Sequence, residues 1–214
     1  TMAAELAEAA EAINADNDIY VVLLSGAGKY FCKGGDAAIT RSPAEAITAI
    51  DRPVIAAING PASGLGFEIA LAADIRICSE VATFSLPYLA EGRLPSGGAT
   101  QRLPRIVGRG KALELLLTTP VLSAQEALEI GLVTTVYPAK ELDDEAMKLA
   151  ASVAAKGPLA LRYLKEAVVK GMDMTLDQGL RLEADLYFLL HTTSDRTEGI
   201  TSFREKRNPE YKGK

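Results

Sequence analysis

A glycine-rich turn between an apolar run and a helix-forming run constrains this chain more than any other stretch. Residues 53–58 have the length and apolar character of a buried strand, and good helix formers follow Gly66. Together with Gly60 and Gly64, that glycine allows a tight turn and a close approach of another backbone segment. The first amides of such a helix, near Leu65, lack intrahelical partners and lie at the positive end of the helix dipole. The turn therefore predicts a site for an oxygen atom that gains negative charge.

A carboxylate, Glu68, falls within the first turn of that expected helix. There it could transfer protons next to the oxygen that the amides hold. An ordinary strand–turn–helix unit with a solvent-facing glutamate explains the same residues, because glycine turns are common. This stretch taken alone leaves both interpretations open.

Strands and helices alternate over much of the chain, and helices dominate its last third. We expect strands at 19–25, 53–58, 74–78, 82–85 and 132–136. We expect further helices at 2–14, 43–50, 99–107, 110–118, 123–130, 141–155, 158–170 and 175–190, and a last helix that begins near Ser194-Asp195 as its N-cap. The alternation predicts parallel strands joined by helical crossovers, which is an α/β fold. We place an α/β core in residues 1–138 and a helical region in residues 139–214.

Charge and composition argue against several classes of function. A net charge of −5 offers no broad basic field for nucleic acid, and no apolar run reaches membrane-spanning length. Cys32 and Cys78 have no metal-ligand spacing, so a reducing compartment is the default: the cytoplasm, or the mitochondrial matrix in a eukaryote. The single histidine, His191, argues against multi-histidine metal sites and serine–histidine catalysis, and we expect it to be packed and neutral.

Seven motifs in a fixed order resemble the crotonase, or enoyl-CoA hydratase/isomerase, superfamily. They occupy residues 31–36, 53–60, 64–68, 73–74, 97–103, 123–133 and 195–207. Each is weak alone, but together they span nearly the whole chain in the right order. The resemblance implies a spiral of ββα units with two roughly perpendicular sheets and a C-terminal helical region that forms trimers or hexamers. It implies an acyl-CoA thioester as the substrate.

The resemblance also assigns a pair of backbone amides that hold the thioester carbonyl, at Gly35 and Leu65. Family members commonly have glycine at the second position, and leucine keeps the amide while its side chain could narrow the pocket. The further substrate-binding positions that the resemblance implies are Lys33, Gly34, Asp36, Gly64, Phe203 and Lys206. Polarising a thioester carbonyl stabilises an enolate, and the loss of one such donor typically costs about 3 kcal/mol in the barrier.

The loop after Phe84 departs from the hydratase pattern of this family, which usually includes two glutamates. The first matches Glu68, but Tyr88 occupies the position of the second, and Glu91 lies three residues further on. Either Glu91 reaches the site along a different loop path, or Glu68 works alone with Tyr88 as a hydrogen-bond donor. Tyr88 could also be only a pocket wall, and Glu91 only a solvated loop charge.

Two stretches are shorter than the family pattern. The usual N-terminal hairpin is absent before residue 1, and the short connection from Asp36 to Pro53 suggests that a loop is missing near Thr40-Arg41. If so, part of the acyl pocket and of the adenine contact lies outside this sequence.

The hypothesis that these residues favour is an enoyl-CoA hydratase that adds water across an α,β double bond, with Glu68 as the acid/base. Another crotonase reaction, namely double-bond isomerisation, decarboxylation or C–C hydrolysis, stays open because some family members lack one of the two glutamates. A non-catalytic relative that binds acyl-CoA or RNA is a third hypothesis, which Glu68, both glycine turns and the acidic charge disfavour. We expect no metal, no nicotinamide and no cofactor other than the coenzyme A of the substrate.

Overall fold

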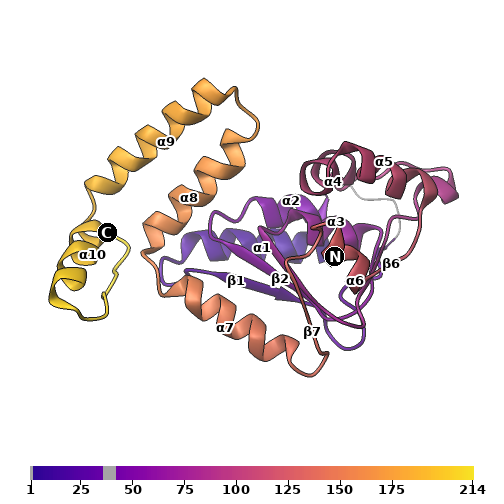
Figure 1. The fold of residues 1–214 in the computed structure, drawn as a ribbon, viewed down its shortest axis with the longest axis horizontal. Helices are drawn as coiled ribbons and strands as arrows, with labels where there is room; N and C mark the ends of the chain where they lie inside the picture. Colours follow the sequence, from indigo (N-terminus) through magenta and orange to yellow (C-terminus); the bar gives the residue numbers. More distant parts are fainter. Residues whose placement is uncertain (1, 36–41) are drawn as a thin grey trace.

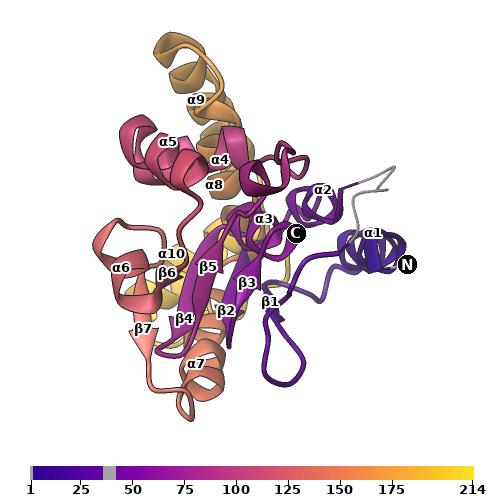
Figure 2. The same ribbon diagram turned by 90° about the vertical axis from the view of Figure 1, so that its right-hand side faces the viewer.

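The computed structural model describes residues 2–35 and 42–214, and its centre is a four-stranded parallel sheet in the order β1-β2-β4-β7. These strands are β1 Val22–Ser25, β2 Val54–Ile58, β4 Ile75–Ser79 and β7 Thr135–Tyr137. A smaller sheet contains β3 Ala62–Ser63, β5 Thr83–Ser85 and β6 Leu122–Ser123, in the order β3-β5-β6. In that sheet β3 and β5 run parallel, whereas β5 and β6 run antiparallel (Figure 2). The expected α/β class with parallel strands is confirmed.

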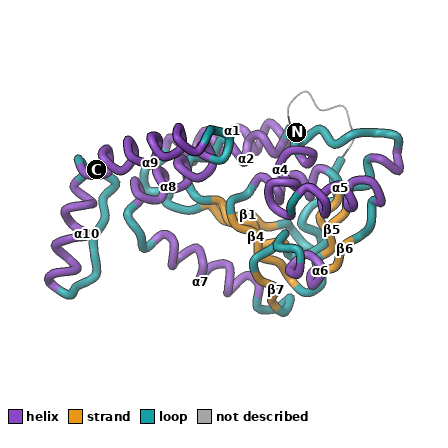
Figure 3. Tube along the Cα trace, turned by 45° about the horizontal axis from the view of Figure 1, so that its top comes forward, coloured by secondary structure: helices purple, strands orange, loops and turns teal. Residues whose placement is uncertain are grey.

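Helices connect these strands and form most of the chain after β7 (Figure 1). They are α1 Met2–Ala15, α2 Pro43–Thr48, α3 Leu65–Ala72, the 3₁₀ helix η1 Leu89–Glu91, α4 Ala99–Val107, α5 Arg109–Thr118, α6 Ala124–Glu129, α7 Leu142–Ala154, α8 Pro158–Gly171, α9 Leu176–His191 and α10 Ser194–Glu205. The bounds agree with the predicted helices to within a few residues. Figure 3 shows the strands gathered in one part of the molecule, with α10 at the far end.

Helices cover both faces of the central sheet, so β2 is buried at every residue. On one face, Ile55 and Ala57 pack with Leu142 and Ala146 of α7. On the other face, the alternate residues of β2 join the main core, which includes Phe67 of α3. Burial on both sides explains why this strand is a continuous apolar run rather than an alternating pattern. Helix α7 therefore packs on the sheet, although it lies in the second part of the predicted division at residue 138, and that division stays a prediction.

An ion pair attaches α8 to the start of the sheet. The Nζ atom of Lys165 lies 2.7 Å from Oδ2 of Asp74 and donates to the carbonyl oxygen of Arg52 at 2.9 Å. The same Asp74 oxygen accepts from the amide of Val54 at 2.7 Å, so one carboxylate joins α8 to the ends of two strands. Most of the ion pair is shielded from water, which makes it stronger than an exposed pair.

The chain after α10 folds back onto the start of that helix. Thr193, rather than the predicted Ser194-Asp195, is the N-cap, and its side-chain oxygen accepts from the amide of Arg196. Asp195 is buried instead, and its carboxylate accepts from the amides of Lys212 and Gly213 at 2.7 and 2.9 Å. The residue that the sequence suggested as a cap therefore holds the C-terminal tail.

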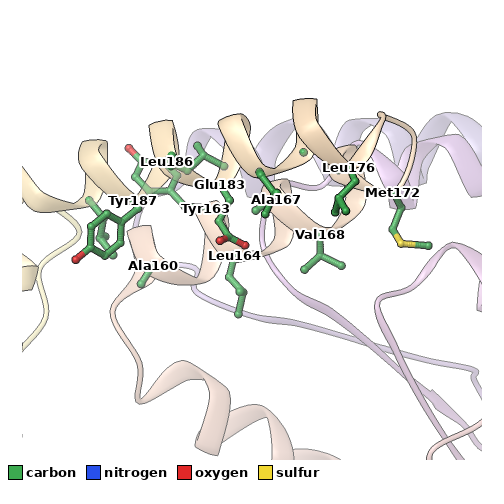
Figure 4. Close-up of a pocket in the computed structure, with 15 residues that line it drawn as sticks. Ala160, Tyr163, Leu164, Ala167, Val168, Met172, Leu176, Glu183, Leu186 and Tyr187 are labelled. Carbon is green, nitrogen blue, oxygen red and sulfur yellow. The ribbon is translucent and has the colours of Figure 1, made fainter.

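The C-terminal helices α8 and α9 leave a large apolar surface open. A groove of about 830 Å³ runs between them and is lined mainly by apolar side chains, including Leu164, Val168 and Leu176 (Figure 4). These three side chains are 65%, 58% and 79% exposed in the single chain. An apolar patch of this kind is typical of a surface that contacts another protein molecule or a ligand.

His191 lies at the end of α9 and is exposed, with its ring centroid 4.4 Å from that of Tyr187. The expectation of a packed histidine is therefore wrong for the single chain, because α9 turns this residue away from the core.

Over residues 2–35 and 42–214, none of the helices has both the length and the apolar character needed to cross a bilayer.

Candidate functional site

The glycine turn before α3 leaves the first backbone amide of that helix without an intrahelical hydrogen-bond partner. Gly64 is the N-cap, with φ of 53°, and having no side chain it cannot cap the helix. Its own amide donates to the carbonyl oxygen of Ser85 at 2.9 Å. Leu65, as the first residue of the helix, therefore presents an amide with neither an intrahelical partner nor a side-chain cap. An N–H group in this position can donate to an oxygen from outside the chain.

A second backbone segment, residues 31–35, packs against this turn. The amide of Ser63 donates to the carbonyl oxygen of Cys32 at 2.9 Å. A Cβ atom built on Gly34 would lie 2.9 Å from the Ser63 carbonyl oxygen and 3.5 Å from the Leu65 nitrogen. Because Gly34 also has φ of 82°, glycine suits both the backbone conformation and the close approach. The two predicted amide-bearing segments are therefore neighbours.

The remaining residues of that loop are placed as follows. Gly35 is exposed, with open space where a Cβ atom would stand. The Nζ atom of Lys33 lies 3.6 Å from the ring centroid of Tyr30, which is a cation–π contact at the surface. Asp36 and the region near Thr40-Arg41 lie outside the described residues. The roles of Gly35 and Lys33 toward a substrate stay predictions.

Glu68 is the centre of a buried polar cluster rather than a solvent-facing residue. Its side chain has no exposed surface. Oε2 accepts from the hydroxyl of Tyr88 at 2.6 Å, and Oε1 accepts from the amides of Gly97 and Ala99 at 2.7 and 3.0 Å. Three donors converge on one carboxylate, an arrangement that compensates for burying a charged group. The interpretation of Glu68 as a solvated helix residue is therefore wrong.

Tyr88 faces both Glu68 and the glycine turn. It is buried, and a Cβ atom built on Gly64 would lie 3.5 Å from its hydroxyl oxygen. Burial, followed by the hydrogen bond to Glu68, raises the pKa of the Tyr88 hydroxyl above its usual range. The phenol therefore stays protonated and donates to the carboxylate at neutral pH.

Residues 97–103 form a motif of the family resemblance, but no role was predicted for the turn at residues 97–99. A Cβ atom on Gly97 would lie 2.9 Å from the carboxyl carbon of Glu68, so only a glycine fits without moving the carboxylate. Gly98 follows with φ of 99° and is the N-cap of α4. Two adjacent glycines directly before a helix were the available signal, at the end of a stretch, residues 86–98, that is rich in turn residues.

The other predicted site residues lie apart from this cluster. Glu91 ends η1, and its exposed carboxylate pairs with Arg93, which supports the interpretation of a solvated loop charge. Phe203 is 84% exposed on α10, and Lys206 follows as the exposed C-cap of that helix. Figure 1 places α10 and α3 far apart along the molecule. The structure therefore does not bring Phe203 or Lys206 to Glu68. The carboxylate of Glu91 makes no hydrogen bond to the cluster among the described residues, although the guanidinium carbon of its partner Arg93 lies 5.4 Å from the Tyr88 ring centroid. The roles of all three stay predictions.

Metal and thiol chemistry have little support in the described residues. Within 2–35 and 42–214, no group of three or more His, Cys, Asp or Glu side chains is arranged to hold a metal ion. Cys78 is buried, and burial raises the pKa of its thiol to about 12, which suppresses the nucleophilic thiolate. Cys32 is half-buried and contributes its backbone to the loop described above. Glu68 is therefore the described side chain best placed for acid/base chemistry.

Comparisons with known proteins identify the family of the chain. The family model described as enoyl-CoA hydratase/isomerase matches residues 1–214. The chain is 42% identical over 217 residues to the YngF protein of Bacillus subtilis (strain 168), covering 94% of this chain and 84% of that one. It is 40% identical over 223 residues to the crotonyl-CoA hydratase of Syntrophomonas wolfei, covering 97% and 86%.

Solved structures give the same result. The crystal structure of an enoyl-CoA hydratase from Bacillus anthracis superimposes with a TM-score of 0.95 at 40% sequence identity, covering 99% of this chain and 88% of that one. The predicted crotonase-like fold is thereby confirmed. A family match along the whole chain, relatives at about 40% identity and this superposition show that the chain belongs to the enoyl-CoA hydratase/isomerase family of the crotonase superfamily.

Proposed function

We propose that this protein is an enoyl-CoA hydratase that adds water across the double bond of an α,β-unsaturated acyl-CoA. Membership of the family supports an enzyme that acts on acyl-CoA, either as a hydratase or as an isomerase. The observation that carries the finer proposal is the buried Glu68 carboxylate on the helix whose first amide has no intrahelical partner and no side-chain cap among the described residues. The name of the Syntrophomonas wolfei relative, a crotonyl-CoA hydratase, points to the same reaction.

In the proposed reaction the amides of Gly35 and Leu65 would donate to the thioester oxygen and stabilise the enolate. Water attacks the β carbon as Glu68 accepts one of its protons, and the α carbon then takes that proton back from Glu68. The net change is the addition of one water molecule, and the carboxylate is regenerated. This proton transfer needs no cofactor, and coenzyme A enters only as part of the substrate.

The hydrogen bonds of Glu68 indicate which of its oxygens would react. Each carboxylate oxygen can accept about two hydrogen bonds. Oε1 already accepts from the amides of Gly97 and Ala99, whereas Oε2 accepts only from Tyr88 among the described residues. We therefore assign the transferred proton to Oε2, which retains a free lone pair and lies on the side of Tyr88.

Double-bond isomerisation is the second candidate, because the cluster contains a single carboxylate. One carboxylate is sufficient to move a proton from one carbon of an enolate to another, whereas family hydratases usually employ two.

The deciding experiment incubates the purified protein with crotonyl-CoA and, separately, with a 3-enoyl-CoA. Loss of the conjugated absorbance with a mass gain of one water supports the hydratase, and conversion of the 3-enoyl to the 2-enoyl ester without added water supports the isomerase. Absence of both products would overturn the proposal.

Tyr88 and Glu91 are the two candidates for a supporting role, and they can be separated by substitution. We expect Tyr88→Phe to lower turnover by about 10- to 100-fold, because it removes a hydrogen bond to a buried carboxylate. Glu91→Gln is the matched control on the same loop and should leave turnover unchanged, because that carboxylate is exposed and paired with Arg93. Steady-state rates with crotonyl-CoA provide the measurement. The reverse pattern would make Glu91 the catalytic acid.

We also propose that the chain assembles as a homotrimer or a dimer of trimers. The exposed apolar groove between α8 and α9 is the surface that suggests a partner. Sedimentation equilibrium should give a mass of about three or six times the 22.7 kDa of the chain. A stable monomer at micromolar concentration would contradict this prediction.

A further inference from the structure

We propose that Arg102 is a positioning residue for Glu68: it holds the turn at residues 97–99 so that two amides point at the carboxylate. The inference rests on the proposed function, in which Glu68 transfers a proton. Arg102 acts on Glu68 through the backbone of the turn, which the sequence places only within a motif of the family resemblance, residues 97–103.

The guanidinium binds the carbonyl group that separates the two donating amides. Nη1 of Arg102 donates to the carbonyl oxygen of Gly97 at 2.6 Å. The Gly97 amide lies on one side of that carbonyl along the chain and the Ala99 amide on the other, and both donate to Oε1 of Glu68. Holding this one carbonyl therefore limits the rotation of the peptide units that carry both donors.

Gly98 allows the guanidinium to pack directly onto the turn. A Cβ atom there would lie 2.2 Å from Nη1 of Arg102, so any side chain would displace the guanidinium. The backbone of Arg102 is also attached to the turn, because its amide donates to the Gly98 carbonyl oxygen at 2.9 Å. Side chain and main chain of one residue in the first turn of α4 thus bind the same three-residue segment.

Charge adds to this geometry. Arg102 is half-buried; burial lowers the pKa of its guanidinium, whereas the negative charges of Glu68 and then Glu45 raise it. Glu68 of α3 and Glu45 of α2 are the negative groups whose charges act on Arg102.

The kinetic test compares Arg102→Met and Arg102→Lys with Arg105→Met. Arg105 is the matched control because it lies on the same helix and makes exposed contacts with Gln101 and Asp173. We expect Arg102→Met to lower kcat by about 10- to 100-fold with little change in KM, since a small misplacement of a catalytic group costs about 100-fold. Arg102→Lys keeps a cationic donor for the Gly97 carbonyl and should recover part of the lost kcat, and Arg105→Met should match the wild type in every respect.

A second readout does not depend on turnover. In ligand-free protein labelled with ¹⁵N-glycine, the Gly97 amide proton should resonate at low field because it donates to a carboxylate, and Glu68→Gln identifies its signal. Arg102→Met should move that signal upfield, whereas Arg105→Met should not. If Arg102→Met loses activity but keeps the wild-type Gly97 signal, the positioning role is wrong. If the wild type converts no acyl-CoA while the Gly97 signal responds to Arg102, the proposed function fails and the structural contact stands.

Discussion

Glu68→Gln is expected to lower turnover by about 10²- to 10⁴-fold, which is the usual range for removing a general acid/base. Glutamine is nearly isosteric, and its carbonyl oxygen can still accept from the Gly97 and Ala99 amides in place of Oε1. Its amide nitrogen can donate to the Tyr88 hydroxyl oxygen, so the contact between the two side chains is kept while the exchangeable proton is lost. Substrate binding should therefore survive. Crotonyl-CoA turnover and calorimetric titration with a saturated acyl-CoA measure the two quantities separately.

Glu91→Gln is again the control for this experiment, because it removes an exposed carboxylate from a nearby loop. If Glu68→Gln retains most of the activity and Glu91→Gln abolishes it, the loop acid is the catalyst. If neither substitution matters, the hydratase proposal fails. A decarboxylation that depends mainly on the amides of Gly35 and Leu65 would then be the better account of the site.

Gly66→Ala is expected to have the second largest effect, by moving the loop at residues 31–35 away from the start of α3. A Cβ atom at Gly66 would lie 2.1 Å from the carbonyl oxygen of Cys32, which is a backbone atom and cannot rotate away. The loop must therefore shift relative to the Leu65 amide. Misplacing one donor to the thioester oxygen should cost about 10²- to 10³-fold in turnover. Overpacking should cost a further 1–3 kcal/mol or so of folding stability.

Gly110→Ala is the matched control for that substitution. Gly110 is also in a helix, but no atom lies within 4 Å of the position where its Cβ would stand. Its replacement should leave turnover unchanged and should not lower the free energy of unfolding, as measured by urea denaturation. Full activity in Gly66→Ala would show that the loop and the helix start do not act together on the substrate.

Local patterns in the sequence were sufficient to predict most of the elements. The apolar run at β2 and the glycines before α3 act through backbone conformation and burial, both of which depend on near neighbours in the chain. The strand–turn–helix unit and the position of Glu68 in the first turn of α3 follow directly from such patterns. Ordered motifs along the chain were likewise sufficient to identify the family.

At the C-terminus, local sequence patterns did not predict the long-range contacts that the structure shows. Asp195 has the residue type and position of an N-cap, yet it accepts from amides 17 and 18 residues further along the chain. His191 follows an apolar run, yet it is exposed because the packed face of α9 is opposite. Local propensity shows that Asp195 could cap a helix, but the path of the C-terminal tail determines which amides its carboxylate accepts from.

By itself, then, the sequence determined the α/β alternation, the glycine turn and the place of Glu68 on its helix, since each depends on residues a few positions apart. Only the tertiary structure decided the surroundings of that carboxylate. Its donors come from Tyr88, Gly97 and Ala99, which are 20, 29 and 31 residues away in the chain. Tyr88 and Glu91 are separated by a single short turn, yet one is buried against Glu68 and the other faces water. The direction in which a loop turns at η1 depends on packing across the whole core, and that packing cannot be obtained from the spacing of residues along the chain.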